Sequence, residues 1–269
     1  WSVERGGQQQ RTPPDNSYFV PGYQIQLLKM ISSTLSIIFL NLVSLTSGFT
    51  IQQKLGSRQY ISTSFHAAPD SLEDLIDISD QWDPIKNDLN MVPAFACTND
   101  QGQPLQYDVG TGPLAFFFLD IDAAKDELQK AKDDTKMEGL NLVPFPLGEV
   151  FEMAAKKLAM VVPPQKGIEA AGAPSGMNPL GQQVPLFGCM DVVETLADGT
   201  SMVPLFLSMD EAKEALNMAL EGLPADEQSK FDVTVMPLAG AVQMQATNSD
   251  KSFTYVAPRS SLDYLQSLE

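Results

Sequence analysis

The sequence VPAFAC at residues 92–97 returns as VPLFGC at residues 184–189, and this repetition decides the fold. A second block, FFLDIDAAKDEL at residues 117–128, returns in the same order as LFLSMDEAKEAL at residues 205–216. Insertions collect in surface loops rather than in packed elements, so matched blocks with different spacers predict two copies of one structural unit. Two copies are too few for an open solenoid, which favours one pseudo-symmetric body.

Each copy is expected to run helix, strand, strand, helix, strand, helix. Residues 92–97 and 114–119 read as strands because short apolar runs flank a turn sequence. A carboxylate, Asp120 or Asp122, is expected to cap the helix that follows. In the second copy Ser208 opens the corresponding helix with a capping box. The predicted fold class is α+β, with two pseudo-symmetric repeat halves, each a small antiparallel sheet with helices packed on one face.

Composition divides the chain into segments. We assign residues 1–29 to a leader or disordered tail, 30–48 to a signal peptide, 49–69 to a transit-peptide-like segment, 70–159 to the first repeat half, 160–183 to a linker rich in Pro, Gly and Ala, 184–246 to the second repeat half, and 247–269 to a C-terminal tail.

The N-terminal segments have the composition of a two-part targeting address. A basic residue, Lys29, precedes an uncharged apolar run at residues 31–45 that is too short to span a bilayer, and small residues follow it. Residues 49–69 contain Lys54 and Arg58 but no acid. This pattern resembles proteins sent to plastids of secondary, red-lineage origin, in which a Phe such as Phe49 stands at the cleavage point. A buried core helix at residues 31–45 is the alternative.

Charge is distributed unevenly along the chain. The net charge is −17, yet residues 16–69 contain no Asp or Glu. The body that follows is therefore strongly acidic, which disfavours nucleic acid as a partner because its binding depends on Lys and Arg neutralising phosphates. An acidic body attracts basic peptides instead.

The sequence lacks the residues that nucleophilic catalysis, metal binding and nucleotide binding commonly require. The sole histidine, His66, falls in the transit-like segment, so the body has no imidazole for a nucleophile or for a metal site. Neither a dinucleotide-binding nor a P-loop glycine pattern is present. We expect no catalytic residue, no metal and no cofactor, and we expect no transmembrane span in the mature chain.

Two sets of residues remain as candidate sites. Continuous apolar runs place bulky side chains on both faces of a strand; a second layer covers the outward set, or that set lines an apolar groove. The candidate groove residues are Phe116, Phe117, Phe118, Leu119, Phe206 and Leu207. The two cysteines, Cys97 and Cys189, fall at matching positions of the copies. They are a candidate thiol pair, with three alternatives: buried small hydrophobes, a disulfide, or reactive thiols.

The repeated motifs resemble a known family. The tandem VPxFxC blocks, the two helix openings and VPFPLGEVF at residues 143–151 are similar to the twenty-two-kilodalton Tic family, the small intermembrane-space component of the chloroplast inner-envelope translocon. The resemblance covers residues 89–245 and implies two related α/β halves with apolar grooves. It also implies a role in preprotein import with chaperone-like behaviour. It carries over no functional residue.

These observations predict a non-enzymatic plastid import factor that binds preprotein or transit-peptide segments and translocon components. The expected location is the envelope intermembrane space of a plastid of secondary origin. The alternative is a pigment-free structural subunit docked on a plastid membrane complex, such as a photosystem, on the stromal or lumenal side of the thylakoid. The second copy matches the family motifs less well than the first, which places an equivalent groove in the second half in doubt.

Overall fold

The computed structural model describes residues 49–51, 82–109, 112–195, 200–247 and 252–268. The predicted leader and signal peptide, and most of the transit-like segment, lie outside these residues. The first half begins after helix α3 (Trp82–Leu89), and its elements are β2 (Pro93–Thr98), β3 (Gln106–Asp108), β4 (Pro113–Phe118), α4 (Ile121–Thr135), β5 (Asn141–Pro146), α5 (Leu147–Ala155), β6 (Ala159–Val162) and α6 (Gln165–Ala170).

The second half repeats this order with one additional short helix, α8. Its elements are β7 (Pro185–Gly188), β8 (Val192–Thr195), β9 (Ser201–Phe206), α7 (Met209–Ala219), α8 (Ala225–Gln228), β10 (Thr234–Pro237), α9 (Leu238–Thr247), β11 (Phe253–Val256) and α10 (Arg259–Gln266).

The strand register confirms that the two halves are copies of one unit. In the first half β2 lies between β4 and β5 and is antiparallel to both, with Phe95 opposite Phe118. In the second half β7 lies between β9 and β10 in the same way, with Phe187 opposite Phe206. Matched apolar positions in the sequence therefore correspond to matched positions in the two sheets.

Each sheet also contains strands that the sequence did not predict. In the first sheet β6 is parallel to β4, and in the second sheet β11 is parallel to β9. A further short strand also pairs with each of these neighbours, β3 with β4 and β8 with β9. Parallel neighbours require a long crossover, which α4, β5 and α5 supply in the first half. The second sheet gains one more strand, β1 (Phe49–Ile51), which pairs antiparallel with β8.

Two predicted boundaries are corrected by these strands. The supposed C-terminal tail, residues 247–269, contains β11 and α10, both packed into the fold. The supposed linker begins with β6, which belongs to the first sheet, and continues into α6. Both strands are only four residues long, and such short runs produce almost no periodic signal.

The helix caps follow the local sequence. Asp120, rather than Asp122, caps α4, because its carboxylate accepts hydrogen bonds from the backbone N–H groups of Asp122 and Ala123. Ser208 caps α7 by accepting from the Glu211 N–H at 3.3 Å. The two capped helices thus begin at equivalent places, directly after β4 and β9.

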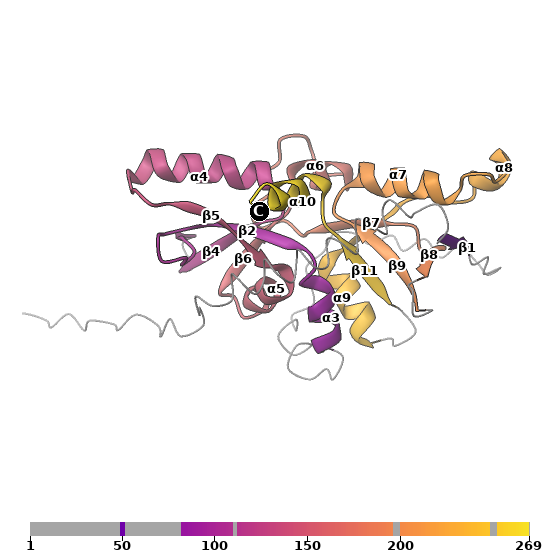
Figure 1. The fold of residues 1–269 in the computed structure, drawn as a ribbon, viewed down its shortest axis with the longest axis horizontal. Coiled ribbons are helices and arrows are strands. Elements are labelled where there is room, and N and C mark those ends of the chain that lie inside the picture. The colour runs from indigo at the N-terminus through magenta and orange to yellow at the C-terminus, as the bar shows by residue number, and fades with distance from the viewer. Residues whose placement is uncertain (1–48, 52–81, 110–111, 196–199, 248–251, 269) are drawn as a thin grey trace, which may run out of the picture.

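Helices cover both faces of the sheets rather than one. Figure 1 shows α4, α6, α10 and α7 along the upper side of the strands and α5, α3 and α9 below them. The lower helices enclose a core shared by both halves, in which Phe117 and Leu205 are buried. This shared core makes the two halves a single body. Among the described residues, no helix has the length and apolar character needed to span a bilayer.

Candidate binding surface

All residues of the predicted groove are buried. Their exposed fractions run from 0% for Phe117 and Leu119 to 9% for Phe206. The structure thus has a second layer over these strands, and the expectation of an open groove is corrected. The continuous apolar runs exist because neither face of the central strands meets solvent.

The candidate groove residues divide between the two faces, as alternation along a strand requires. Phe116 and Phe118 point to the upper side, where they pack with Phe95 and with α4. Phe117 and Leu119 belong to the shared core below, and so does Leu207 of the second half. The upper face of the second half holds Phe206, together with Phe187 and Ala212.

The upper face of the first half is closed by a helix from the second half. Helix α10 follows β11, yet its Leu265 is buried among the upper residues of the first sheet. The ring of Tyr264 meets Phe95 edge-on, with centroids 5.6 Å apart, and Lys125 Nζ of α4 lies 5.1 Å from the centroid of the same Tyr264 ring. We call the residues that receive α10 the α10 seat; they are Phe95, Phe116, Phe118, Ile121, Ala124 and Val162.

The exchange is reciprocal. Helix α6 follows β6 of the first half, and its buried Gly167 approaches Pro185 and the Leu207 carbonyl of the second half. Ala171, directly after α6, packs against the upper cluster that contains Phe206. Each half therefore lends one short helix to the upper face of the other.

The upper faces of the two sheets differ in the side chains that pack beside the exchanged helices. In the first half, Tyr107 of β3 stacks on Phe116, with ring centroids 4.4 Å apart and an interplanar angle of 4°. The second half has Pro204 at the position of Phe116 and no aromatic residue in β8. A small apolar pocket lies there, lined in part by Phe206 and Cys189. The sequence left an equivalent groove in the second half in doubt, and a small pocket lies at this position.

The cysteines are separate, buried thiols. Cys97 and Cys189 are both free, and their exposed fractions are 4% and 7%. Burial raises the pKa of the Cys97 thiol to about 11, and burial also raises the pKa of Cys189. The thiolate is the reactive form, so neither residue is poised as a nucleophile. Of the three alternatives for the two cysteines, the structure agrees with the first: both are buried and occupy the places of small hydrophobic residues.

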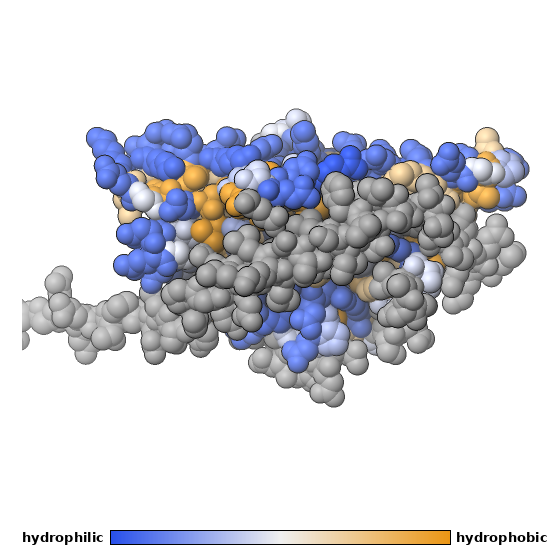
Figure 2. All heavy atoms as spheres, viewed as in Figure 1, coloured by the Kyte–Doolittle hydropathy of each residue, from blue (hydrophilic) through white to orange (hydrophobic). Residues whose placement is uncertain are grey.

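The upper surface is polar outside and apolar beneath. Figure 2 shows hydrophilic residues along the outer side of α4 and α7, and hydrophobic residues gathered below α4 on the visible face. Helix α4 carries acidic residues from its first turn onward, and α7 has Asp210 and Glu211 in its first turn. An acidic rim above an apolar layer suits a basic, amphipathic partner.

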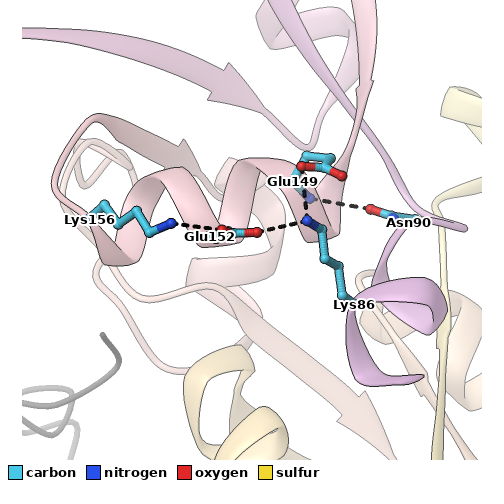
Figure 3. A network of polar contacts seen from close by, with 5 residues as sticks. All are labelled: Lys86, Asn90, Glu149, Glu152 and Lys156. Atoms are coloured by element: carbon cyan, nitrogen blue, oxygen red, sulfur yellow. Dashed lines mark hydrogen bonds and ion pairs between the residues drawn. The ribbon is translucent and has the colours of Figure 1, made fainter. Parts of the chain in front are cut away.

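A polar network on the lower side has a structural role. Figure 3 shows Lys86 of α3 between Glu149 and Glu152 of α5, with N–O distances of 3.1 and 2.7 Å. Asn90 accepts from the Glu149 N–H, and Lys156 pairs with Glu152 at 2.8 Å. Burial opposes ionisation of Glu152, but hydrogen bonds from Lys156 and Lys86 outweigh it and lower its pKa. Paired charges of this kind join α3 to α5 and offer no free acid or base.

A second polar chain links α3 to the second half. Tyr255 Oη donates to Gln245 Oε1 at 3.1 Å, and Gln245 Nε2 donates to Asp88 Oδ2 at 3.2 Å. Burial raises the pKa of the Asp88 carboxyl, although the Gln245 hydrogen bond partly opposes this. The chain fixes α3 against α9 and β11.

The residues of α10 that fill the seat are not among the predicted site residues. Their signal in the sequence is weak: Pro258 sets the helix start, and Leu262 and Leu265 follow at helical spacing. A helix of eight residues shows this spacing only once.

Comparison with known proteins identifies the fold. Tic22 from Plasmodium falciparum shares it at 18% identity and a TM-score of 0.57, over 68% of this chain and 96% of that chain. Anabaena Tic22 (protein transport) shares it at 19% identity and a TM-score of 0.56, over 70% of this chain and 97% of that one. No family model and no curated protein matches the sequence. The chain thus has the Tic22 fold, as the resemblance of its motifs implied.

Proposed function

We propose that this chain is a non-enzymatic plastid protein-import factor that binds preprotein segments in a chaperone-like manner. The observation that carries the proposal is the match to two Tic22 structures over nearly their whole length, one of which is described as a protein of protein transport. A match over nearly the whole length of those structures covers most of the described body of this chain. Translocon components are accordingly the partners we expect.

Surface charge supports binding of basic clients. The chain carries a net charge of −17, and acidic residues lie in the first turns of α4 and α7. Long-range attraction of this kind raises the association rate with positively charged segments and weakens with salt. Apolar surface below α4 then provides contacts that do not depend on salt.

The chemistry of the described residues supports a binding role over catalysis. The buried thiols have raised pKa values, and the carboxylates on the lower side are paired with lysines. In the described ranges, no group of three His, Cys, Asp or Glu residues is placed to hold a metal ion.

The location we propose is the envelope intermembrane space of a plastid of secondary, red-lineage origin. Support comes from the two-part address at residues 30–69 and from the likeness to Tic22 of Plasmodium falciparum. No feature of the described part of the chain favours the photosystem-docking alternative.

An aggregation assay with the full chain tests the proposed function. Light scattering of a chemically denatured client is followed with and without the protein, beside a peptide-binding measurement with a basic, acid-free presequence. We expect reduced scattering, and peptide binding that weakens as salt increases. A peptide of the same length and apolar content in which the basic residues are replaced by acidic ones is the control.

Native fractionation of plastid membranes tests the partner. Co-migration with the translocon in mild detergent supports the proposal. Co-migration with a photosystem, together with no effect on client aggregation, would replace it with the docking-subunit alternative.

A further inference from the structure

Helix α10 is a short helix packed on the upper face of the first half. It is eight residues long, and helices of this length have almost no stability of their own in water. Its contacts with the first half come from Leu265, Tyr264 and Leu262. Figure 1 places it beside α4, next to the C-terminus of the chain.

One side chain of α10 is buried at a cost in free energy. The Ser261 side chain is fully buried, and its Oγ has no hydrogen-bond partner. Burying a hydroxyl without a partner costs free energy, because the group loses the hydrogen bonds that it would make with water. The packing of Leu265 and Tyr264 offsets this cost, and a release of α10 that exposes Ser261 to water recovers it.

Its counterpart α6 is held differently. Helix α6 is continuous at one end with β6 and at the other with the residues that lead into β7, and its Ile168 is 4% exposed. It is therefore tethered at both ends, to a strand of each sheet. Helix α10 follows β11, and the pairing of β11 with β9 involves no residue of α10, so α10 can move away while β11 stays paired.

The contacts of α10 define the chemistry of a helix that fits its seat. The first residue is basic: Arg259 Nη2 lies 3.2 Å from Glu214 Oε2, and the Arg259 backbone N–H donates to Glu211 Oε1. Apolar residues follow at the third and sixth positions after it, Leu262 and Leu265. The seat thus receives an amphipathic helix that begins with a basic residue.

We propose that the α10 seat is a docking site for an amphipathic helical segment of a client polypeptide that begins with a basic residue, and that this segment displaces α10. The two glutamates of α7 receive its basic residue, and Phe95, Phe116 and Phe118 receive its apolar side. This returns Phe116 and Phe118 to a binding role, with their exposure controlled by α10. The identity of the client as a preprotein rests on the proposed function, whereas displacement of α10 does not.

A peptide-binding experiment tests the seat. The probe is a fluorescein-labelled peptide of residues 258–268, and its anisotropy is measured with the full chain and with Leu265→Ser. Wild-type α10 competes with the peptide, so weakening α10 raises the fraction of molecules with an open seat, and we expect binding to tighten about tenfold or more. Leu268→Ser is the matched control: Leu268 is 49% exposed, so its removal leaves binding unchanged. A folded Leu265→Ser chain that binds no better than the wild type overturns the proposal.

A second measurement uses the unaltered full chain. Hydrogen exchange of residues 261–266 is followed with and without the peptide, and with a peptide whose Leu262 and Leu265 are both replaced by Ser. We expect faster exchange in α10 than in α6, with further acceleration only by the unsubstituted peptide. Exchange in α10 as slow as in β4, and unaffected by saturating peptide, contradicts displacement.

A competition arm separates the seat from the client. The basic, acid-free peptide of residues 49–69 is added to the complex of the Leu265→Ser chain with the labelled probe. Displacement supports a presequence as the occupant. If the probe binds but the presequence does not displace it, the seat stands and the assigned occupant is overturned. A dimer of the full chain that dissociates when the probe is added would assign the seat to a second copy instead.

Discussion

The ring of Tyr264, in α10, meets the ring of Phe95, in the first strand of the first half, edge to face at 5.6 Å. This contact joins the two halves and helps to close the upper face of the first sheet. It exists because each half lends a helix to the other, with α10 on the first half and α6 on the second.

Replacing Phe117 by Ala should destabilise the fold severely. The side chain is fully buried in the shared core and packs edge-on against Phe145 at 5.2 Å. Such a truncation costs about 3–5 kcal/mol, a large part of a total stability on the order of 5–15 kcal/mol. Thermal melting measures the effect. Leu158→Ser, at a side chain that is 52% exposed, is the control, and equal melting temperatures for the two variants would contradict the assignment of Phe117 to the core.

Substitution of Asp88 by Asn should raise stability at neutral pH. Burial raises the pKa of Asp88 in the folded state, so the folded protein binds this proton more tightly than the unfolded chain, and stability is lost as pH rises through the range between the two pKa values. Asn stays neutral and keeps an oxygen for Gln245. We expect a higher melting temperature than wild type at neutral pH and little difference below the ordinary Asp pKa. A pH-independent difference would show that ionisation of Asp88 is not its cause.

Gly148→Ala should loosen the contact between α3 and α5. A Cβ at position 148 would collide with the Lys86 carbonyl oxygen, and overpacking of this kind costs about 1–3 kcal/mol. The matched control is Gly240→Ala in α9, where the nearest atom is a carbon of the Pro237 ring at 3.1 Å. Chemical denaturation compares the two. The interpretation is wrong if Gly240→Ala destabilises the protein as much as Gly148→Ala does.

Thiol titration should find two slow cysteines. Cys97 and Cys189 are buried, free and raised in pKa, so we expect almost no reaction with an aromatic disulfide reagent in native buffer and reaction of both thiols in denaturant. A chain purified without reductant that yields no thiol in denaturant would contradict the assignment of both cysteines as free thiols.

Processing should remove the targeting segments in two steps. The change from an acid-free stretch to one containing Asp70, Glu73 and Asp74 predicts cleavage near Gly48-Phe49 and again between residues 67 and 70. The second step removes β1 and leaves the outer edge of β8 without that partner. N-terminal sequencing of protein purified from plastids checks both sites, and a mature chain that begins before Met30 contradicts them.

The sequence by itself determined the repeat, the fold class and which positions of the two copies are equivalent. VPxFxC blocks place Phe95 and Phe187 on equivalent strands, and local capping residues start α4 and α7, because these features depend on residues close together in the chain.

Only the tertiary structure decided which faces of the strands are covered, and by what. Four-residue strands such as β6 and β11 exist because a neighbouring strand pairs with them, and α10 is helical because a seat more than a hundred residues away in sequence buries Leu265. A continuous apolar run such as Phe116 to Leu119 is compatible with an open groove or with a covered strand. Long-range packing chose the covered strand, because burying both faces removes the most apolar surface from water.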